Sequence, residues 1–226
     1  MYRAQRNSVS PREHKGFWSS VTGLQATCRH CWDFYISQRD DLNKSVGVGY
    51  GQVFEDEFMK FLKTKGIDSE EGDDQNMNYP DIRVLKRGGK PACYLELKYL
   101  TAPFLTVRKN VDLNRDCYEG SATLDCDEKL IAQRRLVEHE IPEQVYYVYW
   151  LDYPCIKGVF YWEAESVYSY VDSVGGLEFT RRTREGDFAK TFGGTRKVGH
   201  IDKVYVPLLQ MKSFRELMDE LRGRAV

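Results

Sequence analysis

The sequence lacks any long hydrophobic run, and none of its apolar stretches approaches the roughly 20 residues that a membrane-spanning helix needs. Residues 1–18, MYRAQRNSVSPREHKGFW, also lack the apolar core of a secretory signal peptide. Internal repeats and low-complexity tracts are absent as well, which argues against a solenoid or a disordered chain. These absences predict a soluble, cytoplasmic protein with no membrane partner.

An excess of charge is also lacking, because 33 Lys and Arg residues balance 34 Asp and Glu residues to a net charge of −1. That balance by itself gives no support to nucleic-acid binding. Residues 181–203 are locally basic, however, with seven Lys or Arg residues against three acidic ones. The stretch fits a phosphate-binding surface beside an acidic metal site, although a solvated charged loop is the simpler explanation of the stretch taken alone.

A chain of 226 residues, of which 42% are hydrophobic, suits a single domain spanning 1–226. Apolar periodicity and β-branched or aromatic runs predict its elements, and the segment 101–126 is expected to be irregular. The predicted helices are 51–64, 127–140 and 213–222, and the predicted strands are a short one near 67, then 81–86, 92–100, 144–152, 157–164 and 203–209. This order indicates an α/β fold with a mixed sheet flanked by helices.

Three charged residues occupy an unusual place in this pattern. In YPDIRVLKRGGKPACYLELKYL, residues 79–100, Glu96 and Lys98 lie within an apolar strand and Asp81 begins the preceding one. Because side chains alternate along a strand, Glu96 and Lys98 share a face. The turn at 87–90 predicts a hairpin whose splayed end would bring Asp81 beside Glu96. A surface salt bridge would explain Glu-Leu-Lys alone, but Pro-Asp before it makes a shared site the better hypothesis.

Two carboxylates and one ammonium group suit the hydrolysis of a phosphodiester. Mg²⁺ prefers oxygen ligands and is commonly held by one or two carboxylates together with a substrate phosphate. The bound ion lowers the pKa of a water molecule and shields the phosphate charge. A neighbouring lysine can orient that water or stabilise the developing negative charge. The pattern therefore predicts a magnesium-dependent nuclease, in which Mn²⁺ can replace Mg²⁺.

The pair Pro80-Asp81, followed by Glu96-Leu97-Lys98, resembles the motif of the PD-(D/E)XK nuclease superfamily. The segment GQVFEDEFMKFLKTKG is similar to the helix that precedes this motif in many members. It matches at Gly51, Glu55, Phe58, Leu62 and Gly66. The resemblance implies a restriction-endonuclease-like core of order α-β-β-β-α-β at about 47–152, with additions at 1–46 and 153–226.

The resemblance also implies roles for the motif residues. Asp81 and Glu96 would bind the metal together with the backbone carbonyl of Leu97. Lys98 would position the water molecule that attacks phosphorus. The products would be 5′-phosphate and 3′-hydroxyl ends.

Two helices supply further candidates. An acid of the first helix would reach the metal directly or through water; the helical angle does not separate Glu55 from Glu57, whereas the glycine spacing of the family favours Glu55. A solvent-facing acid is the alternative for either residue. On the second helix, Gln133 and Arg134 are secondary candidates, and Gln133 resembles a polar residue that some relatives place near the scissile phosphate. The QxxxY pattern of exonuclease-type relatives is not completed, since a valine stands four residues after Gln133.

The cysteines give a weaker signal. Cys28 and Cys31 form CRHC, which is half of a typical zinc site. A matching second half is missing, because Cys117 and Cys126 are not spaced as a CxxC pair. Free thiols in a reducing compartment are therefore favoured over a zinc site.

The candidate DNA contacts are basic residues after the core. The segment TFGGTRK, residues 191–197, is predicted to be a flexible loop that enters a groove of DNA. Arginine suits bidentate contact with guanine or phosphate. The candidates are Arg181, Arg182, Arg184, Lys190, Arg196 and Lys197.

The leading hypothesis from these patterns is a Mg²⁺-dependent DNA endonuclease. A compact core with decorated flanks resembles a type II restriction enzyme, and such enzymes are often homodimers on palindromic sites. A structure-specific repair, phage or mobile-element nuclease fits the same pattern. A non-catalytic nucleic-acid-binding protein that retains the fold is a second class, and a zinc-organised interaction module is a third.

Overall fold

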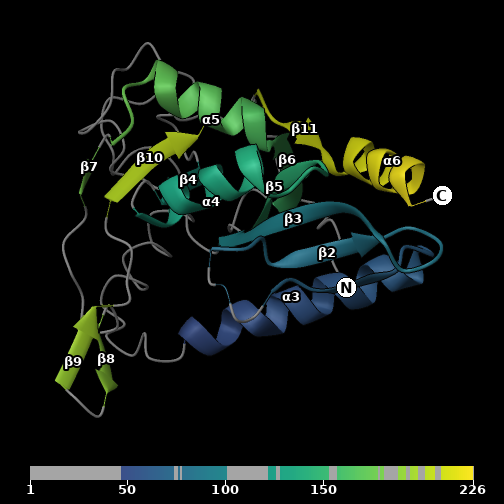
Figure 1. The fold of residues 1–226 in the computed structure, drawn as a ribbon, viewed down its shortest axis with the longest axis horizontal. Helices are drawn as coiled ribbons and strands as arrows, with labels where there is room; N and C mark the ends of the chain where they lie inside the picture. Colours follow the sequence, from purple (N-terminus) through teal and green to yellow (C-terminus); the bar gives the residue numbers. More distant parts are fainter. Residues whose placement is uncertain are drawn as a thin grey trace.

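A six-stranded mixed sheet of order β1-β2-β3-β5-β6-β11 forms the centre of the protein (Figure 1). Strands β3 and β5 are parallel, and the other neighbouring pairs are antiparallel. The strands are β1 (Ser69–Glu71), β2 (Ile82–Leu85), β3 (Pro91–Leu100), β5 (Val145–Asp152), β6 (Lys157–Glu163) and β11 (Lys212–Ser213). This computed structural model describes residues 47–73, 76, 78–100, 122–125, 128–152, 157–177, 179–180, 188–191, 194–197, 202–206 and 210–225.

Helix α3 (Gly47–Thr64) precedes the sheet and ends where the sequence predicts. Gly66 adopts a φ of 73°, a left-handed conformation that favours glycine. The Ile67 amide then donates to the Leu62 carbonyl at 3.1 Å, and the Gly66 amide donates to Lys63 at 3.1 Å. These two bonds form a Schellman motif, which ends the helix and turns the chain toward β1.

The predicted hairpin is formed by β2 and β3. Gly88 and Gly89 have φ values of 105° and 81° and allow the chain to reverse. Ile82 is opposite Leu95 and Val84 is opposite Cys93 in the register. The ladder between β2 and β3 ends at Ile82 and Leu95, and beyond Leu95 strand β3 continues beside β5.

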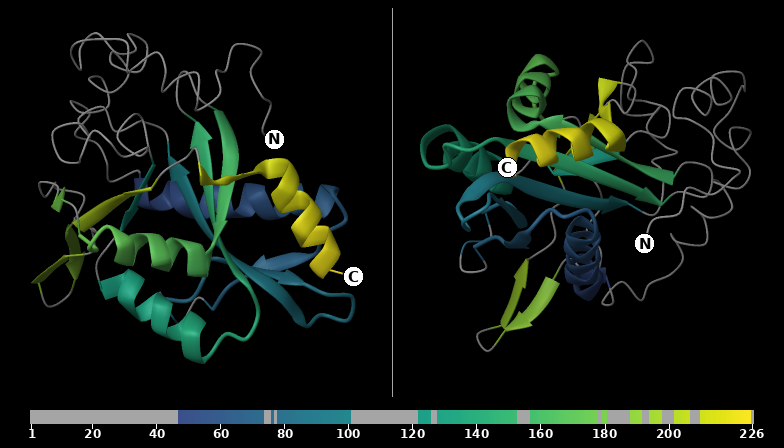
Figure 2. Two further views of the ribbon diagram at one scale, coloured as in Figure 1. Left: turned by 90° about the horizontal axis from the view of Figure 1, so that it is seen from above. Right: turned by 90° about the vertical axis from the view of Figure 1, so that its right-hand side faces the viewer.

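Helices cover both faces of the sheet (Figure 2). Helices α4 (Glu128–His139) and α5 (Ala164–Ser173) contribute to one buried apolar cluster, and α3 and α6 (Phe214–Arg224) contribute to the other. Alternate residues of β5 divide between the clusters, because Tyr147 and Tyr149 face α4 and α5 while Tyr146 and Val148 face α3 and α6. The strand order and the covering helices confirm the predicted α/β class with a mixed sheet.

Several elements differ from the sequence predictions. The segment expected to be irregular contains β4 (Ala122–Asp125), which pairs with β10 (Asp202–Val206) in a second sheet that also includes β7 (Phe179–Thr180). The predicted strand 203–209 therefore does not extend the main sheet. Strands of two to five residues carry too few positions for their pairing partners to be predicted from local patterns.

Two further differences concern helices and loops. The strand predicted at 157–164 ends at Glu163, and α5 follows at once, because Ala164, Val167, Tyr168 and Val171 have helical spacing and are all buried. The segment predicted as a flexible loop contains β9 (Gly194–Lys197) paired with β8 (Phe188–Thr191) in a hairpin. Among the described helices, none is long and apolar enough to cross a membrane.

Candidate active site

Asp81 comes directly before β2, and its side chain lies against the backbone of β3. Extending the register by one position puts Asp81 opposite Glu96. The Leu97 amide donates to Asp81 Oδ2 at 2.7 Å, so a side chain accepts the bond that a continuing strand would have accepted. The Asp81 carbonyl accepts from the Gly72 amide at 2.8 Å. A Cβ at Gly72 would lie 2.0 Å from the Pro80 carbonyl oxygen, so this close approach requires glycine.

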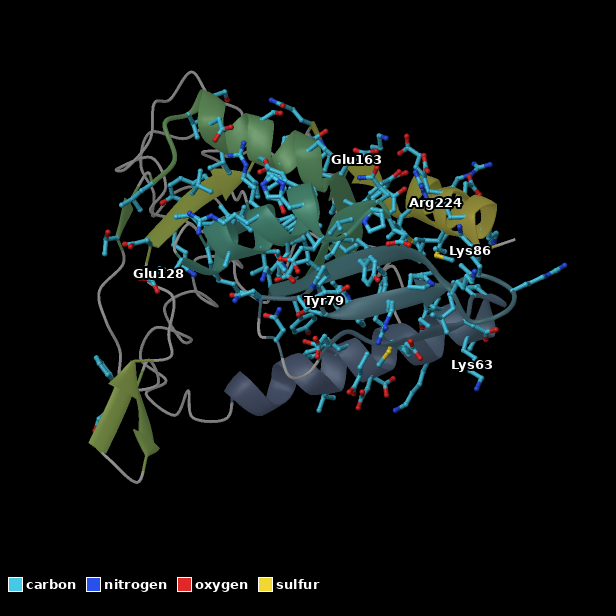
Figure 3. The ribbon with its side chains drawn as sticks, in the orientation of Figure 1. Lys63, Tyr79, Lys86, Glu128, Glu163 and Arg224 are labelled. Atoms are coloured by element: carbon cyan, nitrogen blue, oxygen red, sulfur yellow. The ribbon has the colours of Figure 1, made fainter. Side chains whose placement is uncertain are left out.

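Glu96 is buried and accepts three side-chain hydrogen bonds. Lys98 Nζ lies 2.5 Å and Lys129 Nζ lies 3.0 Å from Glu96 Oε1. Gln133 Nε2 donates to Glu96 Oε2 at 2.7 Å. The predicted sharing of a face by Glu96 and Lys98 is therefore observed, and α4 contributes two further partners. Tyr79, before β2, and Glu128, at the start of α4, are labelled in Figure 3 beside these segments.

The two carboxyl groups have opposite electrostatic behaviour. Burial alone would raise the pKa of Glu96, but the charges of Lys98 and Lys129 outweigh it and lower the pKa to about 2. Burial raises the pKa of Asp81 to about 7, and the negative charge of Glu96 adds to the rise. Glu96 is thus firmly ionised, while ionisation of Asp81 puts a second negative charge beside it. An additional cation would relieve that repulsion.

The structure distinguishes the two acids of α3. Burial raises the pKa of Glu55, and the negative charge of Glu96 raises it further, so Glu55 lies within electrostatic range of Glu96. Glu57 instead forms an exposed ion pair with Lys60 at 3.0 Å. Of these two acids, Glu55 is therefore the one whose pKa responds to the charge of Glu96. Within the described part of the chain, no three acidic, histidine or cysteine side chains form a metal-ligand cluster.

A chain of buried hydrogen bonds extends the site beneath α4. The Tyr147 hydroxyl donates to Gln133 Oε1 and lies 3.4 Å from the Tyr168 hydroxyl of α5. Gln133 is thereby fixed at both ends of its amide, with Glu96 on one side and Tyr147 on the other. Tyr149 lies two residues further along the same face of β5, but its buried hydroxyl has no hydrogen-bond partner among the described residues.

The two tyrosines allow a matched test of this network. We expect Tyr147→Phe to lower the free energy of unfolding by about 1–2 kcal/mol, because it leaves the buried Gln133 oxygen without its donor. Tyr149→Phe removes a buried hydroxyl that has no described partner, and we expect it to raise the free energy by about 1 kcal/mol. Urea unfolding of both variants measures the difference. Equal losses in the two variants would contradict the described network.

The remaining predicted residues lie elsewhere. Arg134 forms ion pairs at 2.8 Å with Glu138 and with Asp172 of α5, on the outer side of α4. The positions Lys190, Arg196 and Lys197 belong to the β8–β9 hairpin. The predictions for Arg181, Arg182, Arg184, Cys28 and Cys31 lie outside the described residues.

Sequence reasoning missed two residues of the site. Lys129 stands four positions before Gln133, so a helical reading would have placed both on one face of α4. Tyr147 stands opposite Glu96 in the parallel register of β3 and β5, which no local pattern gives. The signal for Lys129 was available once Gln133 had been chosen, whereas the signal for Tyr147 required the sheet pairing.

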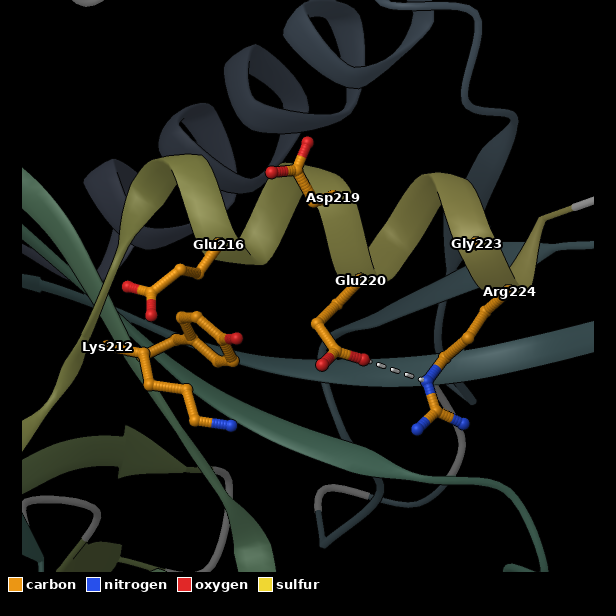
Figure 4. A pocket seen from close by; sticks show the side chains of 7 residues that line it. Lys212, Glu216, Asp219, Glu220, Gly223 and Arg224 are labelled. Carbon is orange, nitrogen blue, oxygen red and sulfur yellow. Dashed lines mark ion pairs between the residues drawn. The ribbon is translucent and has the colours of Figure 1, made fainter.

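A separate open pocket of about 560 Å³ lies along α6 (Figure 4). It is lined by Tyr161, Lys212, Glu216, Asp219, Glu220, Gly223 and Arg224. Its charged groups are largely paired with one another or with near neighbours: Glu220 lies 3.7 Å from Arg224, and Lys212 pairs with Glu163. It shares no residue with the carboxylate pair, so we place the chemistry at Asp81 and Glu96 instead.

No family model, no curated protein and no solved structure matches the chain.

Proposed function

We propose that this protein is a Mg²⁺-dependent endonuclease that hydrolyses phosphodiester bonds of DNA. The observation that carries the proposal is the meeting of Asp81 and Glu96 on neighbouring segments, with Lys98 bound to Glu96 at 2.5 Å. An ammonium group beside two neighbouring carboxylates can hold a metal ion and orient a water molecule for phosphodiester hydrolysis. We also propose that α3-β1-β2-β3-α4-β5 forms a restriction-endonuclease-like core.

The donor set fits a divalent metal ion. An ionised carboxylate offers about four acceptor positions, and the three described bonds to Glu96 leave room for a further ligand. The N–H and C=O groups of one strand residue point to the same side, so the Leu97 carbonyl lies on the side of Asp81, to which the Leu97 amide donates. Asp81, Glu96 and the Leu97 carbonyl would hold the ion, with Glu55 reaching it through water.

When bound, the metal ion would supply Lewis acidity, lowering the pKa of a coordinated water molecule and neutralising phosphate charge. Lys98 would orient the attacking water, because Glu96 holds its ammonium group at the edge of the site. Gln133 would act through Glu96 by fixing the orientation of that carboxylate. The displaced 3′ oxygen would leave on the side opposite the water.

The β8–β9 hairpin is the described element best suited to contact DNA. Its residues 188–197 include Lys190, Arg196 and Lys197 and no acidic residue. The hairpin stands apart from the main sheet in Figure 1, and Phe188 is 44% exposed. A two-stranded ribbon fits the major groove of B-DNA. We therefore propose that this hairpin replaces the predicted flexible loop as the groove-reading element.

The decisive experiment is cleavage of supercoiled plasmid by purified protein in Mg²⁺ and in EDTA. We expect cleavage only with the metal, and we expect Asp81→Ala and Lys98→Ala to reduce the rate at least about 100-fold. Lys60→Ala, which removes an exposed lysine of α3, is the matched control and should cut normally. Discrete bands would indicate a sequence-specific restriction enzyme, for which a homodimer is the expected assembly, and preference for branched substrates would indicate a structure-specific nuclease.

Failure of the wild-type protein to cut plasmid, branched or single-stranded DNA with any divalent metal would overturn the nuclease proposal. Retained DNA binding in that case would favour the non-catalytic alternative. Cleavage by Lys98→Ala at the wild-type rate would show that Lys98 does not take part in catalysis.

A further inference from the structure

Glu96 carries two ammonium groups on one oxygen. Lys98 and Lys129 both bind Oε1, at 2.5 Å and 3.0 Å, and their side chains are 19% and 22% exposed. Lys98 comes from the same strand as Glu96, two residues further on, whereas Lys129 reaches the carboxylate from the first turn of α4. The lysine from α4 is therefore a second cation at the site, supplied by a different element.

A divalent ion and two ammonium groups cannot all remain close to one carboxylate at low cost, because the three cations repel one another. Lys98 is held near Glu96 by its position on β3. Lys129 sits on a helix that also bears Gln133, and Gln133 is fully enclosed between Glu96 and Tyr147. Of these two α4 residues, Gln133 is buried, whereas the half-buried Lys129 side chain reaches solvent and can turn from the carboxylate toward a bound anion.

We propose that Lys129 is a second catalytic lysine, which pairs with Glu96 in the metal-free protein and contacts the scissile phosphate once a metal ion is bound. This inference rests on the proposed nuclease function and names a further residue of its substrate site. In the metal-free state Lys129 neutralises Glu96; in the loaded state it neutralises a non-bridging phosphate oxygen. No bond to Lys129 forms or breaks in either state.

The salt dependence of DNA binding tests, without requiring cleavage, whether Lys129 moves from Glu96 to a phosphate oxygen. Each lysine-phosphate contact contributes about 0.9 to the slope of log Kd against log salt. With Ca²⁺ as a non-cleaving metal, we expect Lys129→Ala to reduce that slope by about 0.9 on duplex DNA. In EDTA, where Lys129 pairs with Glu96, we expect the slope of the variant to equal that of the wild type.

Two control variants and two further measurements accompany the slopes. Arg135→Ala removes a neighbouring exposed cation of α4 and should change the slope equally in Ca²⁺ and in EDTA, or not at all. Lys129→Arg keeps the charge and should restore most of the Ca²⁺-dependent slope. Thermal unfolding of all variants verifies folding. In cleavage at saturating Mg²⁺, we expect kcat of Lys129→Ala to fall roughly 100-fold, the lower end of the range for one lost electrostatic contact.

Two results would overturn the inference. One is an unchanged slope in Ca²⁺ while the wild type binds and cuts DNA, which would leave the nuclease proposal intact and reduce Lys129 to a counter-ion of Glu96. The other is full recovery of kcat in Lys129→Ala at saturating Mg²⁺. If the wild type neither binds nor cuts DNA, the nuclease proposal fails first and the role of Lys129 fails with it.

Discussion

Replacing Glu96 by glutamine is expected to lower the free energy of unfolding by about 2–3 kcal/mol and to reduce cleavage about 1,000-fold. The amide keeps the shape of the side chain but removes the charge that Lys98 and Lys129 share. Removing one partner of a buried ion pair leaves the other uncompensated, and the partial exposure of the two lysines moderates the loss. Loss of a ligand carboxylate accounts for the expected fall in rate.

The pH dependence of this loss has a definite sign. The pKa of Glu96 is lower in the folded protein, at about 2, than its ordinary value of 4.5. Its ionisation therefore stabilises the fold fully above about pH 4.5, and this contribution disappears as the pH falls toward 2. Urea unfolding at pH 7 and pH 3 should show the gap between wild type and Glu96→Gln narrowing in acid.

Glu138→Gln is the matched control for Glu96→Gln. Glu138 forms an exposed i,i+4 pair with Arg134 on the same α4 that carries Lys129. Exposed pairs contribute little, so this variant should unfold close to wild type. Equal stability of Glu96→Gln and wild type at pH 7 would show that Glu96 is not the charged centre of the site.

Replacing Asp81 by asparagine is expected to have the opposite effect on stability and the same effect on cleavage. The asparagine side chain can still accept the hydrogen bond of the Leu97 amide, but it does not repel Glu96. We expect the metal-free variant to be more stable than wild type by about 2 kcal/mol at pH 8, because ionising the buried aspartate beside Glu96 costs the folded protein free energy. Cleavage should fall about 1,000-fold with the lost ligand.

The pH profile of Asp81→Asn also has a definite sign. The folded pKa of Asp81, about 7, lies above its ordinary value of 3.8, so the folded protein retains a proton that the unfolded chain has released. The contribution of protonated Asp81 to the free energy of unfolding is therefore complete below about pH 4 and is lost as the pH rises through 7. The advantage of Asp81→Asn should therefore be absent at pH 4 and complete at pH 8.

The Asp81 experiment also includes a measurement with added Mg²⁺ and a control variant at a surface acid. At pH 8, Mg²⁺ should stabilise wild type but not Asp81→Asn, because ligand binding to the folded state alone raises its stability. Asp219→Asn changes an exposed acid of α6 and should give no comparable pH-dependent gain. A loss of stability in Asp81→Asn at pH 8 would contradict the repulsion between the two carboxylates.

The opposite effects of Glu96→Gln and Asp81→Asn on the free energy of unfolding distinguish this site from an ordinary buried ion pair. Glu96 is stabilised by its partners in the metal-free protein, whereas ionised Asp81 costs stability there. Functional groups often reduce stability in the absence of their ligand. Among the described residues, the charge of Asp81 therefore adds no stability to the metal-free fold, which supports a cation-binding role.

The strand periodicity of residues 92–100 was sufficient to predict how the central charged residues are arranged. Alternation along β3 places Glu96 and Lys98 on one face, and the glycine turn places β2 beside it. Helix α3 was predictable because its phenylalanines recur at helical spacing and Gly66 ends it. Local periodicity and the residues of the turn are therefore enough to predict the part of the site that lies on β2 and β3.

The contribution of α4 could not be predicted in the same way. Lys129 and Gln133 meet Glu96 across 33 and 37 residues of sequence, and this contact depends on how the helix packs on the sheet. The choice between Glu55 and Glu57 also depended on packing, since both lie at the border of the apolar stripe. Pairing between short strands such as β4 and β10 depends on tertiary contacts in the same way.

The most direct test of the central claim is anomalous X-ray scattering from crystals of the wild-type protein grown with Mn²⁺ at pH 8. We expect a metal peak roughly 2.1 Å from one oxygen of Asp81 and one of Glu96, a typical distance for small divalent ions. The same peak should be missing from Asp81→Asn. A fully occupied Mn²⁺ peak elsewhere, with Asp81 and Glu96 holding no metal between them, would contradict the account.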